Sequence, residues 1–232
     1  MIISHRHKFI YLKTIKTAST SIENVLCSVC GPDDIVTPAA ERFMKLRPGE
    51  MAQNYRIDHP AVPKRPVIKR LLGRPERYHH PSVGYYEHMP GWRVKTYIGD
   101  EIWNEYYKFT FERNPWDRQA SFYRFRKKGR KQEMSFEQFM SKKSRAIVDN
   151  WGIYSIDNKV AVDFLGDYDN LEEEFQKVCD HLKLPGDLSL PKVNTTKKEG
   201  DTPSYRSYYN DKTRDLVADW YAPEIELMGY KY

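Results

Sequence analysis

The sequence predicts an α/β protein in which a mostly parallel central sheet lies between layers of helices. Short apolar runs typical of strands alternate along the chain with longer segments whose apolar residues recur at helical spacing. Parallel strands need a crossover, usually a helix, so this alternation favours a sheet covered on both faces. The chain has 232 residues, of which 40% are hydrophobic. We therefore expect a single domain over residues 1–232 with a substantial core.

In the first half of the chain, residues 8–13 (KFIYLK) predict a strand that leads into a helix. Ser19, Thr20 or Ser21 can cap this helix, which carries apolar residues at helical spacing from Ile22 to Val29. A short helix is expected at 38–46, after a Gly-Pro-Asp-Asp turn. Residues 48–91 carry seven prolines, many basic residues and little periodicity. They are interpreted as a long loop excursion of the kind that often bears function.

The second half predicts three further strand or helix units. Residues 107–112 form a strand that ends at Arg113, and Asn114 and Pro115 suit the N-cap and first position of the next helix. Ser135 and Gln138 fit a capping box at the start of a short helix. We expect a strand over 159–166 and a final helix over 211–228. Between these two lies a helix with one apolar face, formed by Leu171, Phe175, Val178, Cys179 and Leu182.

Composition and charge limit the classes of partner. The net charge is +6, with basic residues concentrated at 64–77 and 124–132, and such stretches attract anions; an ordinary solvated basic surface explains either stretch equally well. No apolar run reaches the roughly 20 residues that span a bilayer, and no signal peptide is evident, so we expect a cytoplasmic protein without a membrane span. Three cysteines complete no metal-binding pattern, and we expect no metal.

The first strand-to-helix turn contains Lys16-Thr17-Ala18-Ser19-Thr20-Ser21. A helix N-terminus offers unpaired N–H groups and a partial positive charge, to which Lys16 adds a full charge and the neighbouring residues add hydroxyl groups. The turn is therefore P-loop-like, but its lysine comes first and it lacks the glycines of the standard motif. This difference disfavours an ordinary nucleoside triphosphatase. The alternative is a polar helix cap with an incidental lysine.

The second strand-to-helix turn begins at Arg113, and Ser121 lies two turns into the helix that follows. The arginine fork suits a phosphate dianion, and a serine hydroxyl can donate to the same oxygens. Ligands of such sheets bind beyond the carboxyl ends of the strands, where both turns are expected. Two anion-binding turns on neighbouring strands indicate a ligand with phosphates at both ends of a nucleoside.

These turns also carry a family resemblance. The segment LKTIKTASTSIENVL resembles the 5′-phosphosulfate loop of the carbohydrate sulfotransferases, most closely that of the heparan uronosyl enzymes. RNPWDRQASFY is similar to the family's 3′-phosphate motif, R-x-P-x-x-R-x-x-S-x-Y. DFLGDYDNLEEEFQKVCDHLKL and the last 25 residues resemble later parts of the same family. The resemblance covers most of the chain and is weakest over residues 48–91.

The resemblance implies a P-loop-like three-layer fold and the transfer of a sulfuryl group to a carbohydrate hydroxyl, without a metal. The donor would be 3′-phosphoadenosine 5′-phosphosulfate (PAPS), and the acceptor could include an anionic glycan, with the 48–91 excursion nearby. Lys16 would also stabilise the leaving group. The residues implied in cofactor binding are Lys16, Thr17, Ala18, Ser19, Thr20 and Ser21 at the 5′ end, Arg113 and Ser121 at the 3′-phosphate, and Lys197 in a later loop at 194–201.

The acceptor hydroxyl needs a general base, for which histidine is the usual choice. The stretch YHHPSVGYY resembles the histidine-containing segment of the heparan uronosyl enzymes, which favours His80, then His79, with His88 third. Three alternatives remain: a small-molecule kinase with the same two turns, a family member that binds the nucleotide without catalysis, and a nucleic-acid-binding protein that uses the basic stretches. The last would explain neither turn, so no specific nucleic-acid partner is expected.

Overall fold

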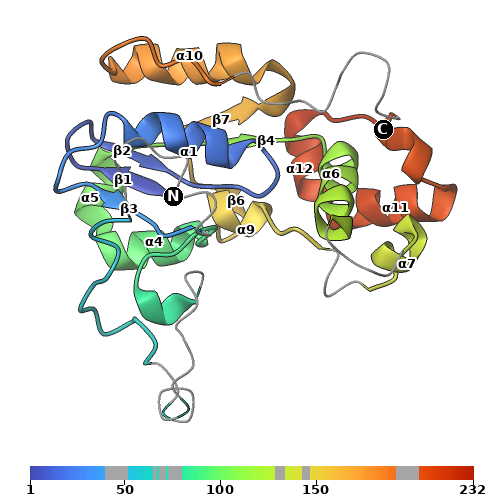
Figure 1. The fold of residues 1–232 in the computed structure, drawn as a ribbon, viewed down its shortest axis with the longest axis horizontal. Coiled ribbons are helices and arrows are strands. Elements are labelled where there is room, and N and C mark those ends of the chain that lie inside the picture. Colours follow the sequence, from blue (N-terminus) through green and yellow to red (C-terminus); the bar gives the residue numbers. More distant parts are fainter. Residues whose placement is uncertain are drawn as a thin grey trace.

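The protein folds around a five-stranded sheet with the strand order β3-β1-β2-β4-β7 (Figure 1). The structure, a computed structural model, describes residues 1–39, 52–64, 67, 72, 80–128, 134–142, 147–191 and 204–232. The strands of the sheet are β1 (Ile2–Ser4), β2 (Phe9–Tyr11), β3 (Ile35–Val36), β4 (Tyr107–Glu112) and β7 (Phe164–Asp167).

Most strands of this sheet share one direction. β2 pairs with β4 in parallel, and β4 pairs with β7 in parallel, whereas β1 is antiparallel to both β2 and β3. Four of the five described strands therefore point the same way, which confirms the predicted mostly parallel sheet. β1 and β3 were not expected from the sequence, because runs of two or three apolar residues show no period.

The two faces of the sheet bury different side chains, so helices cover both. Ile10 and Leu12 contribute to one apolar cluster, whereas Phe9 and Tyr11 contribute to another. The first cluster is closed by α4, α5 and α9, and the second by α1 and α10, in agreement with their placement in Figure 1. These helices are α1 (Ser19–Cys27), α4 (Gly91–Ile98), α5 (Asp100–Glu105), α9 (Trp151–Tyr154) and α10 (Leu171–Leu182). The arrangement gives the three layers that the sequence predicts.

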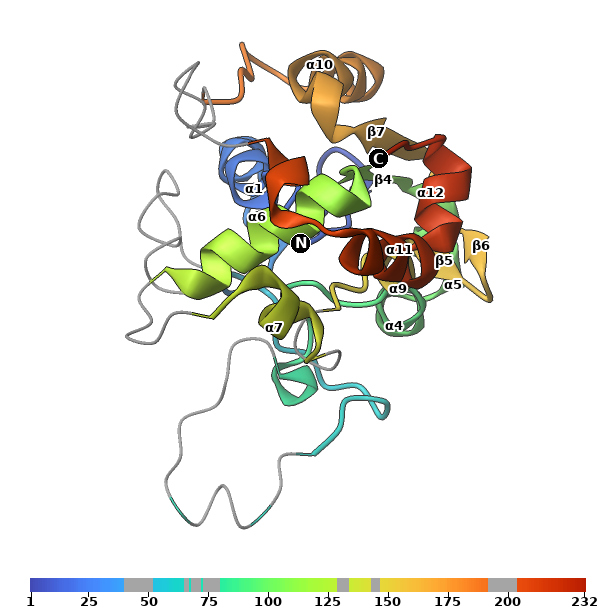
Figure 2. The same cartoon turned by 90° about the vertical axis from the view of Figure 1, so that its right-hand side faces the viewer.

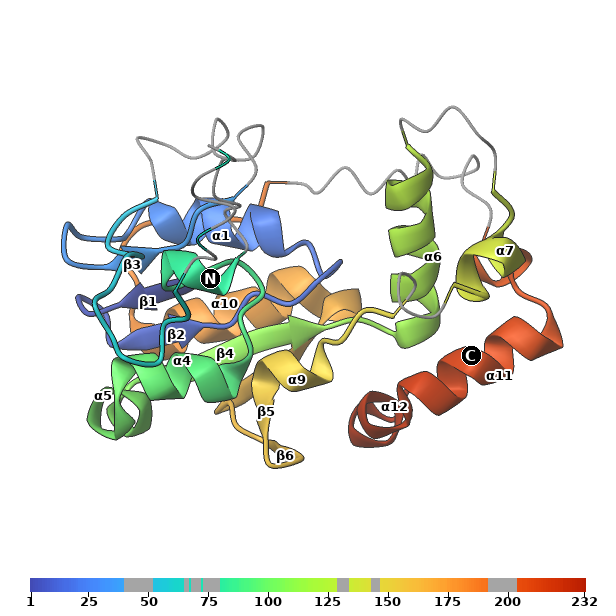
Figure 3. The same ribbon diagram turned by 90° about the horizontal axis from the view of Figure 1, so that it is seen from below.

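A third apolar cluster lies beyond the carboxyl end of β4. Its helical elements stand beside the sheet rather than over its faces, as Figures 1 and 3 show, and in the view of Figure 2 they lie in front of the sheet. They are α6 (Pro115–Lys127), α7 (Phe136–Met140), η3 (Tyr205–Tyr208), α11 (Asp211–Trp220) and α12 (Ala222–Met228). Two predicted caps are confirmed: the Asn114 side chain accepts a hydrogen bond from Trp116 N, and Ser135 and Gln138 form a capping box.

Two predicted elements are wrong in extent. The strand expected at 159–166 is divided, because β5 (Ser155–Ile156) and β6 (Lys159–Val160) form a hairpin and β7 alone joins the sheet. Positive φ at Asp157 and Asn158 makes this tight turn. The final helix breaks at Tyr221, since Pro223 has no N–H to continue the ladder. A new helix, α12, begins at Ala222 with Pro223 in its first turn.

The remaining expectations concern segments that the structure describes in part. The helix predicted at 38–46 lies almost entirely outside the described residues. In the excursion over 48–91, the described part preceding α4 includes a 3-10 turn, η1 (Pro81–Val83). Among the described helices, none combines the length and the apolar character needed to cross a bilayer.

Candidate active site

The turn between β2 and α1, residues 14–18, is named the Lys16 turn here and has an unusual backbone. Lys16 and Ala18 both adopt left-handed conformations, with φ of 66° and 56°. Alternation of this kind makes concavities lined by backbone N–H groups, which bind anions. Ala18 is the N-cap of α1 and makes no side-chain capping bond. Its carbonyl accepts from Ser21 N at 2.8 Å, so the N–H groups of Ser19 and Thr20, which come first in the helix, are the ones that Ala18 leaves uncapped. The backbone therefore fits a tetrahedral anion.

Threonine hydroxyl groups connect this turn to the neighbouring strand β4 through hydrogen bonds. Thr14 Oγ1 donates to the carbonyl of Phe111 at 2.7 Å and lies 2.8 Å from Thr17 Oγ1. Thr14 and Thr17 are both fully buried. The Thr17 hydroxyl thus bonds within the protein, and any contribution of Thr17 to an anion comes from its backbone. Thr20 and Ser21 are half-buried in the first turn of α1, whereas Ser19 is buried.

Lys16 is half-buried and its charge is poorly compensated. Among the described residues, no carboxylate lies within ion-pair distance of its ammonium, which stands 4.7 Å over the Phe125 ring. Burial lowers the pKa of Lys16 to about 8, and the positive charges of Arg113 and Arg124 act in the same direction. A bound anion would relieve both effects.

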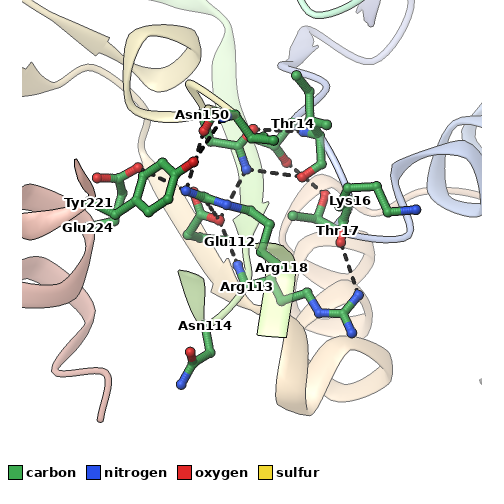
Figure 4. A network of polar contacts seen from close by, with 12 residues as sticks. Thr14, Lys16, Thr17, Glu112, Arg113, Asn114, Arg118, Asn150, Tyr221 and Glu224 are labelled. Carbon is green, nitrogen blue, oxygen red and sulfur yellow. Dashed lines mark hydrogen bonds and ion pairs between the residues drawn. The ribbon is translucent and has the colours of Figure 1, made fainter. Parts of the chain in front are cut away.

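Arg113 brings the second predicted turn into contact with the first (Figure 4). Its Nη1 donates to the carbonyl of Lys16 at 3.2 Å. Its Nε and Nη2 donate to Asp117 Oδ2 at 2.8 and 2.6 Å, and its guanidinium lies 4.2 Å over the Tyr168 ring. Ser121, half-buried, follows on α6. The expected neighbourhood of the two turns is therefore present.

The two described histidines near η1 differ in the hydrogen bonds of their rings. His80 Nδ1 accepts from Ser82 N at 3.1 Å and caps η1, so in the neutral ring the proton sits on Nε2. His88 Nδ1 lies 2.8 Å from the carbonyl of Lys13, which can only accept. Neutral His88 therefore carries its proton on Nδ1 and keeps a lone pair on Nε2. His79 and Lys197 lie outside the described residues.

A buried charge network supports His88. Burial lowers the pKa of His88 to about 4, while the Glu87 carboxylate, 3.7 Å from Nε2, opposes this. Glu87 pairs with Lys13, which also bonds Glu23 Oε2 at 2.7 Å. The ring is thus neutral near pH 7, and a proton taken up on Nε2 would face a carboxylate.

Three residues of this region were missed by the sequence analysis. Arg124 belongs to a basic stretch, and only the fold brings it near Lys16. Glu87 and Asn150 carry no local pattern, since their partners are distant along the chain. Among the described residues, no group of side chains could hold a metal ion.

Comparison with known proteins gives the family of this chain. A model of the Sulfotransferase family matches residues 1–231, so the chain belongs to this family and is a transferase of the sulfuryl-transferring kind. An uncharacterized protein of Archaeoglobus fulgidus is 38% identical over 113 residues, which cover 46% of this chain and 92% of that protein. No solved structure matches the chain.

Proposed function

We propose that the protein is a PAPS-dependent O-sulfotransferase whose acceptor is a carbohydrate hydroxyl, including that of an anionic glycan. The observation that carries this proposal is the hydrogen bond from Arg113 to the carbonyl of Lys16. It joins two anion-binding turns at the ends of adjacent parallel strands, and a nucleotide with phosphate on both its 3′ and 5′ sides suits such a pair.

The residues present fit this cofactor, which would supply the sulfuryl group. Lys16, the backbone from Thr17 to Thr20 and the Ser21 hydroxyl would hold its 5′ end, because the left-handed turn and the start of α1 bring N–H groups together. The Ser21 N–H is not among them, since it donates to the Ala18 carbonyl at 2.8 Å. Arg113 and Ser121 would hold the 3′-phosphate, with Arg124 adding positive charge nearby. Lys197 stays a predicted contact, and the scheme needs no metal.

Lys16 would act on the charge that develops on the departing phosphate oxygen. Its ammonium lies half-buried beside the anion-binding backbone, where a fixed positive charge acts more strongly than it would in water. Because Arg113 bonds the carbonyl of the same residue, the lysine and the 3′-phosphate site keep a fixed relation. Such fixed geometry favours in-line transfer.

For the general base, the geometry supports His88 over the sequence-favoured His80. His88 Nε2 has a lone pair to accept the hydroxyl proton, while the bond from Nδ1 to Lys13 orients the ring. The Nδ1 of His80 is instead used to cap η1. His79 stays a further candidate.

An exposed aromatic side chain supports a sugar as acceptor. Trp92, at the start of α4 and four residues after His88, is 47% exposed. The Arg93 guanidinium lies 4.7 Å over its ring. An aromatic face beside a cation suits an anionic sugar ring, in keeping with the basic excursion over 48–91.

The test is calorimetric titration with 3′-phosphoadenosine 5′-phosphate (PAP), without magnesium, against AMP and ATP. We expect PAP to bind more tightly than AMP. Arg113→Ala should weaken PAP binding at least about tenfold, since charge-assisted pairs with phosphate contribute about 1.5–3 kcal/mol. Arg6→Ala, an exposed change in the β1–β2 connection, serves as control.

Three outcomes would contradict the proposal. Preference for ATP with magnesium would favour the kinase. PAP binding without sulfuryl transfer to any of a panel of glycans would indicate a nucleotide-binding protein without catalysis. Steeply salt-dependent binding to DNA or RNA, with no PAP binding, would favour a nucleic-acid partner.

A further inference from the structure

We propose that Asn150 is a positioning residue that holds the Lys16 turn in its anion-binding shape, and that the C-terminal helices hold Asn150. Its consequence for catalysis rests on the proposed function. The geometric part does not, because it concerns contacts within the chain.

The Asn150 side chain forms two hydrogen bonds with the backbone of Ile15, immediately before Lys16. It is fully buried, its Oδ1 accepts from Ile15 N at 2.8 Å, and its Nδ2 donates to the carbonyl of Ile15 at 3.2 Å. Both halves of the amide are thus used on one residue of the turn. Lys16 itself has a left-handed backbone, which persists in a non-glycine residue only when its surroundings enforce it.

The buried Glu112 carboxylate links Asn150 to both strand-to-helix turns (Figure 4). Glu112 Oε1 accepts from Asn150 Nδ2 at 3.1 Å and from the backbone N–H of Arg113 at 2.7 Å. The same oxygen pairs with Arg118 Nη1 at 2.6 Å. The end of β4 therefore fixes Asn150 and Arg113 at once, from a fully buried position.

The C-terminal helices complete the support from the other side. Arg118 Nη2 pairs with Glu224 Oε1 at 3.2 Å, and its guanidinium lies 4.4 Å over the Tyr221 ring. The Tyr221 hydroxyl accepts from Val148 N at 2.9 Å, two residues before Asn150. Arg118, although part of the RNPWDRQASFY motif, is fully buried in these contacts. A continuous chain of bonds thus runs from α12 to the Lys16 turn.

Such support matters because Lys16 must meet a developing charge at a defined place. A displacement of about 1 Å can cost on the order of 100-fold in rate. Replacing a buried ionic network by apolar residues is often neutral for stability, so the presence of such a network is weak evidence for a stabilising role and leaves room for a role in geometry.

The experiment compares Asn150→Ala with Asp149→Ala. Asp149 is exposed, and its Oδ1 accepts from Gly152 N at 2.9 Å at the start of α9, so its loss perturbs the same helix without touching the Lys16 turn. Three quantities are measured: amide hydrogen exchange of Ile15, affinity for PAP, and kcat with a glycan acceptor. Tyr221→Phe, which keeps the ring, is a second variant.

For Asn150→Ala we expect Ile15 exchange to accelerate about tenfold, because one hydrogen bond is lost. We expect kcat to fall about 10- to 100-fold while PAP affinity changes less. Asp149→Ala should leave Ile15 exchange and kcat within about twofold. Tyr221→Phe should shift both quantities in the same direction but by less, and combining it with Asn150→Ala should add little.

Unchanged Ile15 exchange in Asn150→Ala overturns the positioning role whatever the activity. Faster exchange with unchanged kcat overturns its catalytic consequence. If wild-type protein binds no PAP, the proposed function fails, yet Ile15 exchange still decides the geometric part. If Asn150→Ala does not fold, Tyr221→Phe decides, and unchanged Ile15 exchange in that variant overturns the proposal.

Discussion

The Lys16 turn and the turn at Arg113 lie side by side, but the helices that follow them differ in how their first backbone N–H groups are capped. The N-cap of α1, Ala18, has a left-handed backbone and makes no side-chain capping bond. α6 is capped by the Asn114 side chain and has Pro115 in its first turn, where no N–H is needed. The first turn thus leaves backbone donors to a ligand, whereas the second satisfies its own backbone and offers a side chain.

The cations of the two turns, Arg113 and Lys16, differ in a corresponding way. Arg113 has a permanent charge and is oriented by Asp117 and Tyr168. Lys16 has no carboxylate partner among the described residues, and its pKa is low. A paired, oriented cation suits an anchor, while a poorly compensated one suits the place where new charge appears. We infer that the Arg113 turn anchors the cofactor, whereas the Lys16 turn stabilises the charge that develops during the reaction.

The largest expected effect separates these two roles. Lys16→Ala should lower kcat about 1,000-fold, because under the proposed mechanism it removes the charge that would face the leaving oxygen, while PAP affinity falls less. Lys8→Ala, which loses an exposed pair with Glu105 at the opposite end of β2, should leave kcat intact. Steady-state kinetics and calorimetry measure the split. Turnover of Lys16→Ala close to wild type would remove the distinction between the turns.

A second test concerns the proposed general base beside the Lys16 turn. His88→Ala should lower kcat about 100-fold, the lower range for a general base, whereas His80→Ala should cost mainly the cap of η1. The low pKa of His88, about 4, also predicts that activity persists below pH 6. A larger loss in His80→Ala than in His88→Ala would restore the sequence-favoured residue.

The sequence predicted the parts of this site that follow one another along the chain. KFIYLK and YKFTFE with their helix caps identified two parallel strands and both turns, because strand ends and N-caps have local patterns. The apolar face of α10 was predictable for the same reason.

The rest depends on partners far apart in sequence. Asn150 contacts Ile15 across 135 positions, and Glu87 contacts Lys13 across 74, distances over which no periodicity acts. The choice between His80 and His88 depends on which acceptors or donors each ring meets. The left-handed backbone of Ala18 was also hidden, because alanine gives no local sign of positive φ.

The pH dependence of activity sharpens the comparison of the two cations. Since the pKa of Lys16 is about 8, kcat/KM should fall as pH rises through 8, by about tenfold at pH 9. Bound phosphate favours the ammonium, so the corresponding fall in kcat should occur at higher pH. Lys16→Arg should abolish the fall in kcat/KM, and a fall that persists in this variant would assign the titration to another group.

The smallest effect tests the helix starts themselves. Asn114→Ala should lower the free energy of unfolding by about 1 kcal/mol, whereas Asn114→Asp, which keeps the capping oxygen, should lose less. Ala18→Gly should raise it by about 0.5 kcal/mol, because relief of the left-handed alanine outweighs the added backbone entropy. Urea denaturation at constant m-value measures both. If Ala18→Gly destabilised the protein as much as Asn114→Ala, Ala18 would itself secure the start of α1, and the contrast between a turn open to ligand and a turn closed on itself would fail.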